Sequence, residues 1–139
     1  MYALMETLLL EATGPKPTDE IAQYMAGYFD GEASFMYTRT PVIDVASVYP
    51  YTLRLFSERF GGTVTPRRVS RDSVRDYYQW RVHGNKAIAA LNAALPYLRE
   101  KKAQALLVLE IRQTPPGTTR DGLIAQLKGF KKLEYKHGT

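Results

Sequence analysis

Hydrophobic positions recur with a helical period in some segments of this chain and alternate in others, which divides it into helices and pairs of strands. Apolar and aromatic residues at helical spacing predict a first helix that is capped by Thr18 and ends near Glu32. Alternation predicts a strand over residues 33–40, which Pro41 ends, and a hairpin partner over residues 42–48. The pattern therefore begins with a helix followed by a hairpin.

The same unit is predicted a second time. A helix over residues 50–60 ends at two consecutive glycines, and strands follow over residues 63–69 and 77–83. Further helices are predicted over residues 86–95, 98–112 and 123–133, and a basic tail follows the last of them. Paired strands with separate helices predict the α+β class: an αββαββα core with one antiparallel four-stranded sheet, helices on one face, and additional C-terminal helices.

The length of 139 residues suits one domain. Prolines separate an N-terminal arm, residues 1–17, from the domain at residues 18–112, and a Pro-Pro-Gly linker lies in the segment 113–139. The apolar start lacks a basic segment, so we expect a packing arm rather than a signal peptide. No apolar run approaches the roughly 18–20 residues that cross a bilayer, so no membrane association is expected.

The composition excludes several kinds of functional site. Cysteine is absent, which excludes disulfides and thiolate sites and fits an intracellular protein, either cytoplasmic or organellar. Two histidines, no glycine-rich phosphate loop and no serine–histidine arrangement argue against several other enzyme classes. The net charge is +5, and five arginines lie between Pro66 and His83. Strands that carry arginines suit a phosphate backbone, although a solvated hairpin explains the charge equally well.

Two glycines and two acids mark the end of the first helix. Gly27 and Gly31 share one face, and each costs about 1 kcal/mol relative to alanine inside a helix. Small residues at this spacing let a second helix approach closely, although Gly31 alone can be read as a helix cap. Asp30 and Glu32 bracket Gly31, where the helix dipole disfavours a carboxylate that is not solvated or neutralised. Pairing with a twofold copy would place both Glu32 side chains beside the axis, as oxygen ligands for a divalent cation.

The segment Met25–Phe35 resembles the LAGLIDADG motif of homing endonucleases. The matching residues are Ala26, Gly27, Asp30, Glu32, Ser34 and Phe35. Met25 stands for the usual leucine, Glu32 for the commoner aspartate and Ala33 for the following glycine. Three further segments, residues 60–64, 77–82 and 96–105, follow in the order and spacing of that family. The resemblance extends from about Ile21 to Ile111, and one motif per chain implies a homodimer.

The resemblance implies a saddle-shaped sheet in the major groove of double-stranded DNA. Strand alternation then selects the residues that face DNA, which are Ser34, Met36, Thr38, Thr40, Arg67, Tyr77, Gln79 and Arg81. Tyr24 and Ala26 join Gly27 and Gly31 in the implied helix interface. The implied activity is site-specific cleavage of one phosphodiester per strand. Glu32 of each subunit would bind Mg²⁺, for which Mn²⁺ or Ca²⁺ can substitute in binding, and Lys101 would lie near the scissile phosphate.

Alternatives remain at several positions. Lys101 can be a surface lysine, and each strand position can simply face solvent. Where the family often places a polar residue, near the end of the second strand, only Ser47 and Tyr49 are polar. The alternative functions are a non-cleaving DNA-binding regulator or RNA maturase of the same fold, and a structural dimerisation module. Glu32 and Lys101 favour the nuclease, and a context in an intron or intein would agree with it.

Overall fold

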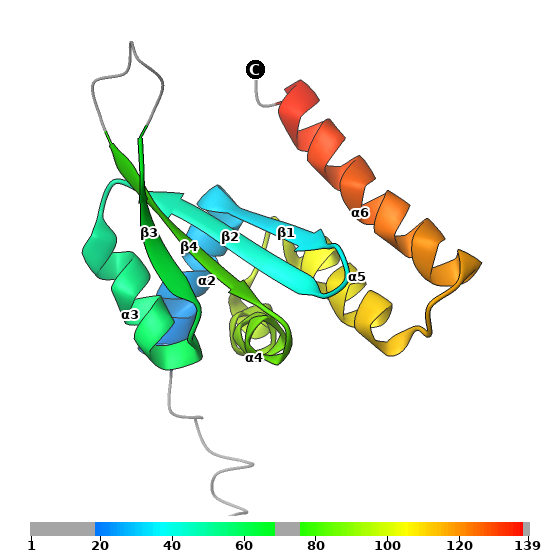
Figure 1. Ribbon diagram of the computed structural model, residues 1–139, viewed down its shortest axis with the longest axis horizontal. Helices are drawn as coiled ribbons and strands as arrows, with labels where there is room; N and C mark the ends of the chain where they lie inside the picture. The colour runs from blue at the N-terminus through cyan, green and yellow to red at the C-terminus, as the bar shows by residue number, and fades with distance from the viewer. Residues whose placement is uncertain (1–18, 69–75, 138–139) are drawn as a thin grey trace, which may run out of the picture.

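The computed structural model describes residues 19–68 and 76–137 (Figure 1). In chain order the elements are α2 (Glu20–Glu32), β1 (Ala33–Tyr37), β2 (Pro41–Ser47), α3 (Pro50–Phe60), β3 (Thr63–Arg67), β4 (Tyr77–His83), α4 (Asn85–Ala94), the 3₁₀ helix η1 (Leu95–Tyr97), α5 (Lys102–Gln113) and α6 (Thr118–His137). This order confirms the predicted α+β fold and its αββαββα core. The predicted arm at residues 1–17 and the predicted cap Thr18 lie outside the described residues.

The four strands form one antiparallel sheet in the order β1-β2-β4-β3. Each predicted hairpin forms, and β2 and β4 join the two hairpins at the centre of the sheet. Helices α2, α3, α4 and α5 lie on one side of this twisted sheet, as predicted, and α6 runs beside β1 and α5 (Figure 1). The opposite face of the sheet is therefore left open by these four helices.

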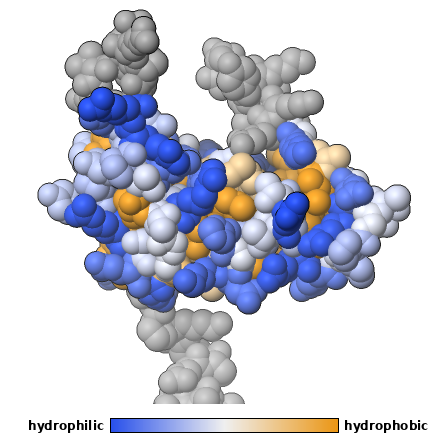
Figure 2. Space-filling view, in the orientation of Figure 1, coloured by the Kyte–Doolittle hydropathy of each residue, from blue (hydrophilic) through white to orange (hydrophobic). Residues whose placement is uncertain are grey.

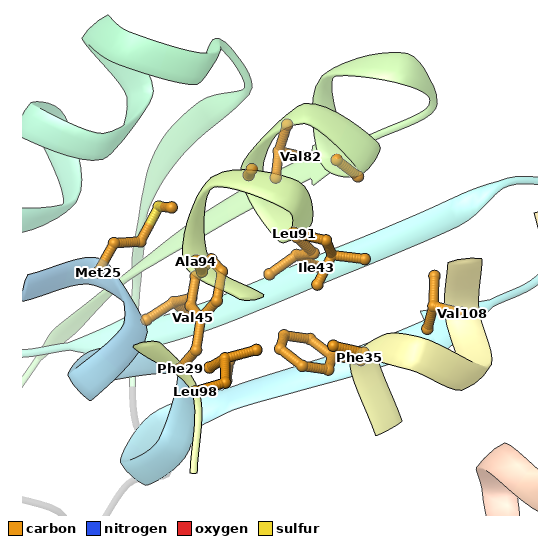
Figure 3. Close-up of a cluster of buried hydrophobic side chains, with 14 of the residues drawn as sticks. Met25, Phe29, Phe35, Ile43, Val45, Val82, Leu91, Ala94, Leu98 and Val108 are labelled. Carbon is orange, nitrogen blue, oxygen red and sulfur yellow. The ribbon is translucent and has the colours of Figure 1, made fainter. Parts of the chain in front are cut away.

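The core lies between the sheet and these helices, where alternate strand residues meet the apolar faces of the helices. Phe35, Ile43 and Val82 point from three strands toward Phe29 and Leu91 (Figure 3). All five side chains are buried, and burying a side chain of this size contributes about 1.5–3 kcal/mol. Because successive strand residues point to opposite faces, burying this set fixes which residues face outward.

A glycine turn connects α3 to the sheet. Gly62 has a φ of 83°, and a Cβ on it would lie 2.5 Å from the carbonyl oxygen of Arg81. The indole Nε1 of the buried Trp80 donates a hydrogen bond of 2.8 Å to the carbonyl oxygen of Gly61. The turn therefore requires glycine at position 62. The carbonyl of Gly61 satisfies the one polar group of the Trp80 side chain.

Several predicted boundaries differ from the observed ones for local reasons. Asp19 caps α2 by accepting a hydrogen bond of 3.1 Å from the Ala22 amide, so the cap lies one residue after the predicted one. The Arg59 guanidinium also binds Asp19, and these contacts hold the pKa of that carboxyl below its usual value. Helix α5 begins four residues later than predicted, after η1. Helix α6 begins five residues earlier, at Thr118, and its Leu127 joins the core.

Candidate functional site

The two acids at the end of α2 have different environments. The carboxylate of Asp30 accepts hydrogen bonds from the backbone amides of Arg99, Glu100 and Lys101, at 3.0, 3.1 and 3.0 Å. Glu32 is exposed, and its carboxylate makes no hydrogen bond or ion pair with any residue that the structure describes. Asp30 therefore attaches the segment before α5 to the end of α2, whereas the Glu32 carboxylate remains available to bind a ligand.

Lys101 lies at the same end of α2. The residue is only 7% exposed, and its ammonium donates a hydrogen bond to the carbonyl oxygen of Ala33, the residue that follows Glu32. A positive charge at a helix C-terminus is favoured by the helix dipole. The alternative of a solvated surface lysine is therefore wrong, because the lysine is buried against the carbonyl end of the helix.

An open groove of about 640 Å³ runs beside the glycine face of α2. It is lined by Tyr24, Gly27, Tyr28, Gly31, Glu32, Ala46, Ser47, Val48, Tyr49 and Tyr77. A Cβ built on either Gly27 or Gly31 would meet no atom within 4 Å. The two glycines, which share this face with Tyr24, thus leave room that no other described part of the chain fills.

One predicted interface residue is wrong. Ala26 is fully buried in the core of its own chain, together with Met25 and Phe29. Each residue advances a helix by about 100°, so Gly27 turns outward while Ala26 turns inward. Contact between the glycine faces of two copies would therefore involve Tyr24, Gly27 and Gly31 but not Ala26.

Most of the predicted DNA-facing residues lie on the open face of the sheet. The strand register and the alternation of buried residues place Ser34, Met36, Arg67, Tyr77, Gln79 and Arg81 there. Thr38 and Thr40 lie in the turn after β1, which ends at Tyr37, and the Thr38 amide donates a hydrogen bond to the Thr40 carbonyl; their place in the strand was wrong, whereas their contact with DNA stays a prediction. Met36 also lines a small groove beside Ile124 of α6.

The sequence interpretation missed Asp44 on this face. Asp44 lies opposite Arg81 in the β2–β4 register and accepts its Nε–H and an Nη2–H, at 2.6 and 2.7 Å. This hydrogen-bonded ion pair raises the pKa of Arg81 above its usual value. On the neighbouring strand, Arg67 donates its Nε–H to the Gln79 side-chain oxygen at 3.0 Å. Alternation also predicted the strand over residues 42–48, and assigning its outward-facing positions, as for residues 33–40, would have located Asp44.

The polar positions near the end of β2 are engaged within the chain. The Ser47 hydroxyl accepts the Tyr49 amide at 3.0 Å and lies 3.5 Å from the Tyr28 hydroxyl. The hydrogen bond with Ser47 is the main cause of a lowered pKa at Tyr28. Ser47, Tyr28 and Glu32 all line the same groove, so that a carboxylate and two hydroxyls occur together beside the end of α2.

Neither a compact metal cluster nor a membrane span is found in the part of the chain that the structure describes. No group of three or more histidine and acidic side chains suited to holding a metal ion occurs among the described residues. None of the described helices combines the length and apolar character that crossing a bilayer requires.

The visible surface in Figure 2 mixes hydrophilic residues with small apolar areas.

Comparisons with known proteins support the fold. No protein-family model and no curated protein sequence matches the chain. Among solved structures, the homing endonuclease I-CvuI in complex with its target is 24% identical, with a TM-score of 0.51, over 76% of this chain and 74% of that one. The archaeal intron-encoded homing endonuclease I-Vdi141I, complexed with DNA, is 16% identical, with a TM-score of 0.51, over 79% of this chain and 96% of that one.

A third similar structure is longer. The LAGLIDADG homing endonuclease I-SmaMI, bound to cleaved DNA, is 20% identical, with a TM-score of 0.55, over 77% of this chain and 42% of that one. At these identities the likeness establishes the fold alone. The chain has the fold of the LAGLIDADG homing endonucleases, as the resemblance of its motif predicted.

Proposed function

We propose that this chain is a site-specific endonuclease of double-stranded DNA that acts as a homodimer. The observation that carries the proposal is the end of α2, where Glu32 presents an unengaged carboxylate beside an open glycine face and Lys101 is anchored to the next residue. Similar structures solved with DNA, one of them with cleaved DNA, support the same activity. We also propose that the protein is intracellular, where it would reach its DNA.

A second copy of the chain is the occupant that best suits the groove. Twofold pairing through Gly27 and Gly31 would bring two backbones close together, since neither residue has a side chain to separate them. It would also cover Tyr24 and Tyr49, which expose 50% and 63% of their surface. An isologous contact of this kind places one Glu32 from each copy beside the twofold axis.

A hard divalent cation suits the donor set at this position. Mg²⁺ is commonly held by one or two carboxylates together with phosphate oxygens and waters, and Glu32 supplies one such carboxylate. Once bound there, the ion would polarise the scissile phosphate and lower the pKa of an attacking water. Glu32 would orient the ion, and Lys101 would keep a positive charge beside the phosphate, where negative charge increases during cleavage.

The open face of the sheet supplies the surface for DNA. Arg67, Gln79 and Arg81 project hydrogen-bond donors from neighbouring strands, and base edges in the major groove offer matching acceptors. A two-stranded ribbon fits the major groove of B-DNA. Two copies of this face would therefore read two half-sites related by the twofold axis.

Ser47 gives a specific reason to retain a second candidate, a DNA-binding protein of the same fold that does not cleave. Its hydroxyl is engaged by the Tyr49 amide and lies close to the Tyr28 hydroxyl. It is therefore less available to organise water than a longer polar side chain would be. A regulator or maturase would keep the dimer and the basic strands without needing such a group.

One experiment separates the two candidates. The purified protein is incubated with a library of duplex DNA sites and Mg²⁺, beside Glu32→Gln and the control Glu110→Gln, which removes an exposed acid from α5. The proposal expects cleavage by the wild type and the control, and binding without cleavage by Glu32→Gln. Equal cleavage by all three would refute the role of Glu32, and selective binding without cleavage by any would favour the regulator.

A further inference from the structure

An acidic residue occupies the surface that we assign to DNA. The four strands, all of which the structure describes, contain one acidic residue, Asp44. A carboxylate there repels phosphates, so its presence needs a reason other than affinity. Asp44 is paired with Arg81, and their side chains are 12% and 51% exposed. The carboxylate is therefore mostly covered, while half of the arginine side chain faces outward.

The geometry of the pair leaves one edge of the guanidinium available. Asp44 binds the side edge of Arg81, formed by Nε and Nη2. The outer edge, formed by one N–H from each Nη atom, is not used by this contact, since a guanidinium has five N–H groups. That outer edge is the one whose spacing suits the O6 and N7 acceptors of guanine. Two strong hydrogen bonds to Asp44 hold it in one direction.

The neighbouring arginine provides a contrast. Arg67 donates its Nε–H to the neutral side chain of Gln79, and this contact leaves its full positive charge uncompensated. The Arg81 pair carries no net charge, which weakens its attraction to phosphates at any sequence but leaves its donors intact. Arg67 thus suits phosphate binding, whereas Arg81 suits the reading of a base.

We propose that Asp44 is a positioning residue that directs Arg81 to a guanine in each half-site and reduces binding to other sequences. This inference rests on the proposed binding of DNA by the open face. It predicts an unusual combination of effects. Removing the negative charge of Asp44 strengthens binding to random DNA and weakens sequence discrimination, because Arg81 is then free to swing toward a phosphate.

The test measures binding to a randomised duplex library and to random-sequence DNA over a range of salt concentrations, with Ca²⁺ present. Asp44→Asn has almost the same shape as the wild type, and Arg81→Ala removes the base contact. Glu58→Gln removes one negative charge from α3, on the helical side, and controls for net charge alone. Thermal unfolding of each variant checks that the fold is retained.

The wild type is expected to select guanine at one position in each half-site. Arg81→Ala should reduce that preference by about 5- to 150-fold, the usual range for a bidentate base contact. Asp44→Asn should lose much of the preference, bind random DNA more tightly and increase the salt slope of log K by about one per subunit. Glu58→Gln should change neither the preference nor the slope by a comparable amount.

The failures are distinguishable. If the wild type binds no duplex, the proposed function is overturned, and this inference with it. If the wild type binds selectively, and Asp44→Asn keeps both its guanine preference and its salt slope, the inference alone is overturned. Selection that survives Arg81→Ala would likewise overturn it and leave DNA binding intact.

Discussion

Replacing both glycines of the α2 face should stabilise the single chain and weaken the dimer. Gly27 and Gly31 have helical backbones, and a Cβ on either would meet no atom within 4 Å. Glycine in a helix costs about 0.8–1.0 kcal/mol relative to alanine, so Gly27→Ala with Gly31→Ala should raise the free energy of unfolding of the monomer by about 1.5–2 kcal/mol. If no second copy packs against the glycine face, the two substitutions would change only the stability of the monomer.

The same two methyl groups should oppose dimer formation. Added methyl groups in a closely packed contact cost about 1–3 kcal/mol, which corresponds to a rise in the dimer dissociation constant of about 5- to 150-fold. Sedimentation equilibrium gives the dissociation constant. Urea unfolding below that concentration, followed by the fluorescence of Trp80, the only tryptophan, gives the stability of the monomer.

Gly122 supplies a matched control. It lies in α6, and a Cβ there also meets no atom within 4 Å, so Gly122→Ala should show a gain in stability without an effect on the dimer. A double variant that dimerises as tightly as the wild type would refute pairing through the glycine face. A double variant that destabilises the monomer would show instead that the glycine face is not open.

Three further predictions concern the fold around the site. Asp30→Asn should lower the free energy of unfolding by about 1–3 kcal/mol, because an amide replaces the carboxylate that accepts three backbone N–H bonds. Urea unfolding measures this loss, and an unchanged unfolding midpoint would contradict the role of Asp30. Trp80→Phe should cost about 2–3 kcal/mol through the lost bond to Gly61 and a cavity, measured by urea unfolding followed by far-UV circular dichroism because this variant has no tryptophan; a loss below about 0.5 kcal/mol would contradict the packing described. Because the pKa of Asp19 is lowered in the folded chain, its contribution is complete above its ordinary pKa of 3.8 and is lost as the pH falls through the lower folded value. The melting temperatures of wild type and Asp19→Asn should therefore converge at acidic pH, and a constant difference would refute this assignment.

Features that depend on residues close together in the sequence were predicted, whereas contacts between residues far apart in the sequence were not. Alternation and turn residues are local signals, and they located β4 and α3 at their observed bounds. The anchoring of Lys101 joins residues 68 positions apart, and the Asp44–Arg81 pair joins residues 37 apart. Such contacts depend on strand order and helix packing, which periodicity does not specify. The orientation of Ala26 was mistaken because the motif shows spacing but not which side of the helix meets its own core.

The most direct test of the account uses dimers that contain one wild-type subunit and one Glu32→Gln subunit, isolated with two different affinity tags. If each Glu32 serves one strand, these mixed dimers should nick a plasmid that carries the selected site and accumulate the nicked circle. The wild type should linearise the same plasmid, and Glu32→Gln dimers should leave it intact. Mixed dimers that linearise the plasmid at the wild-type rate would contradict the assignment of one Glu32 to each strand.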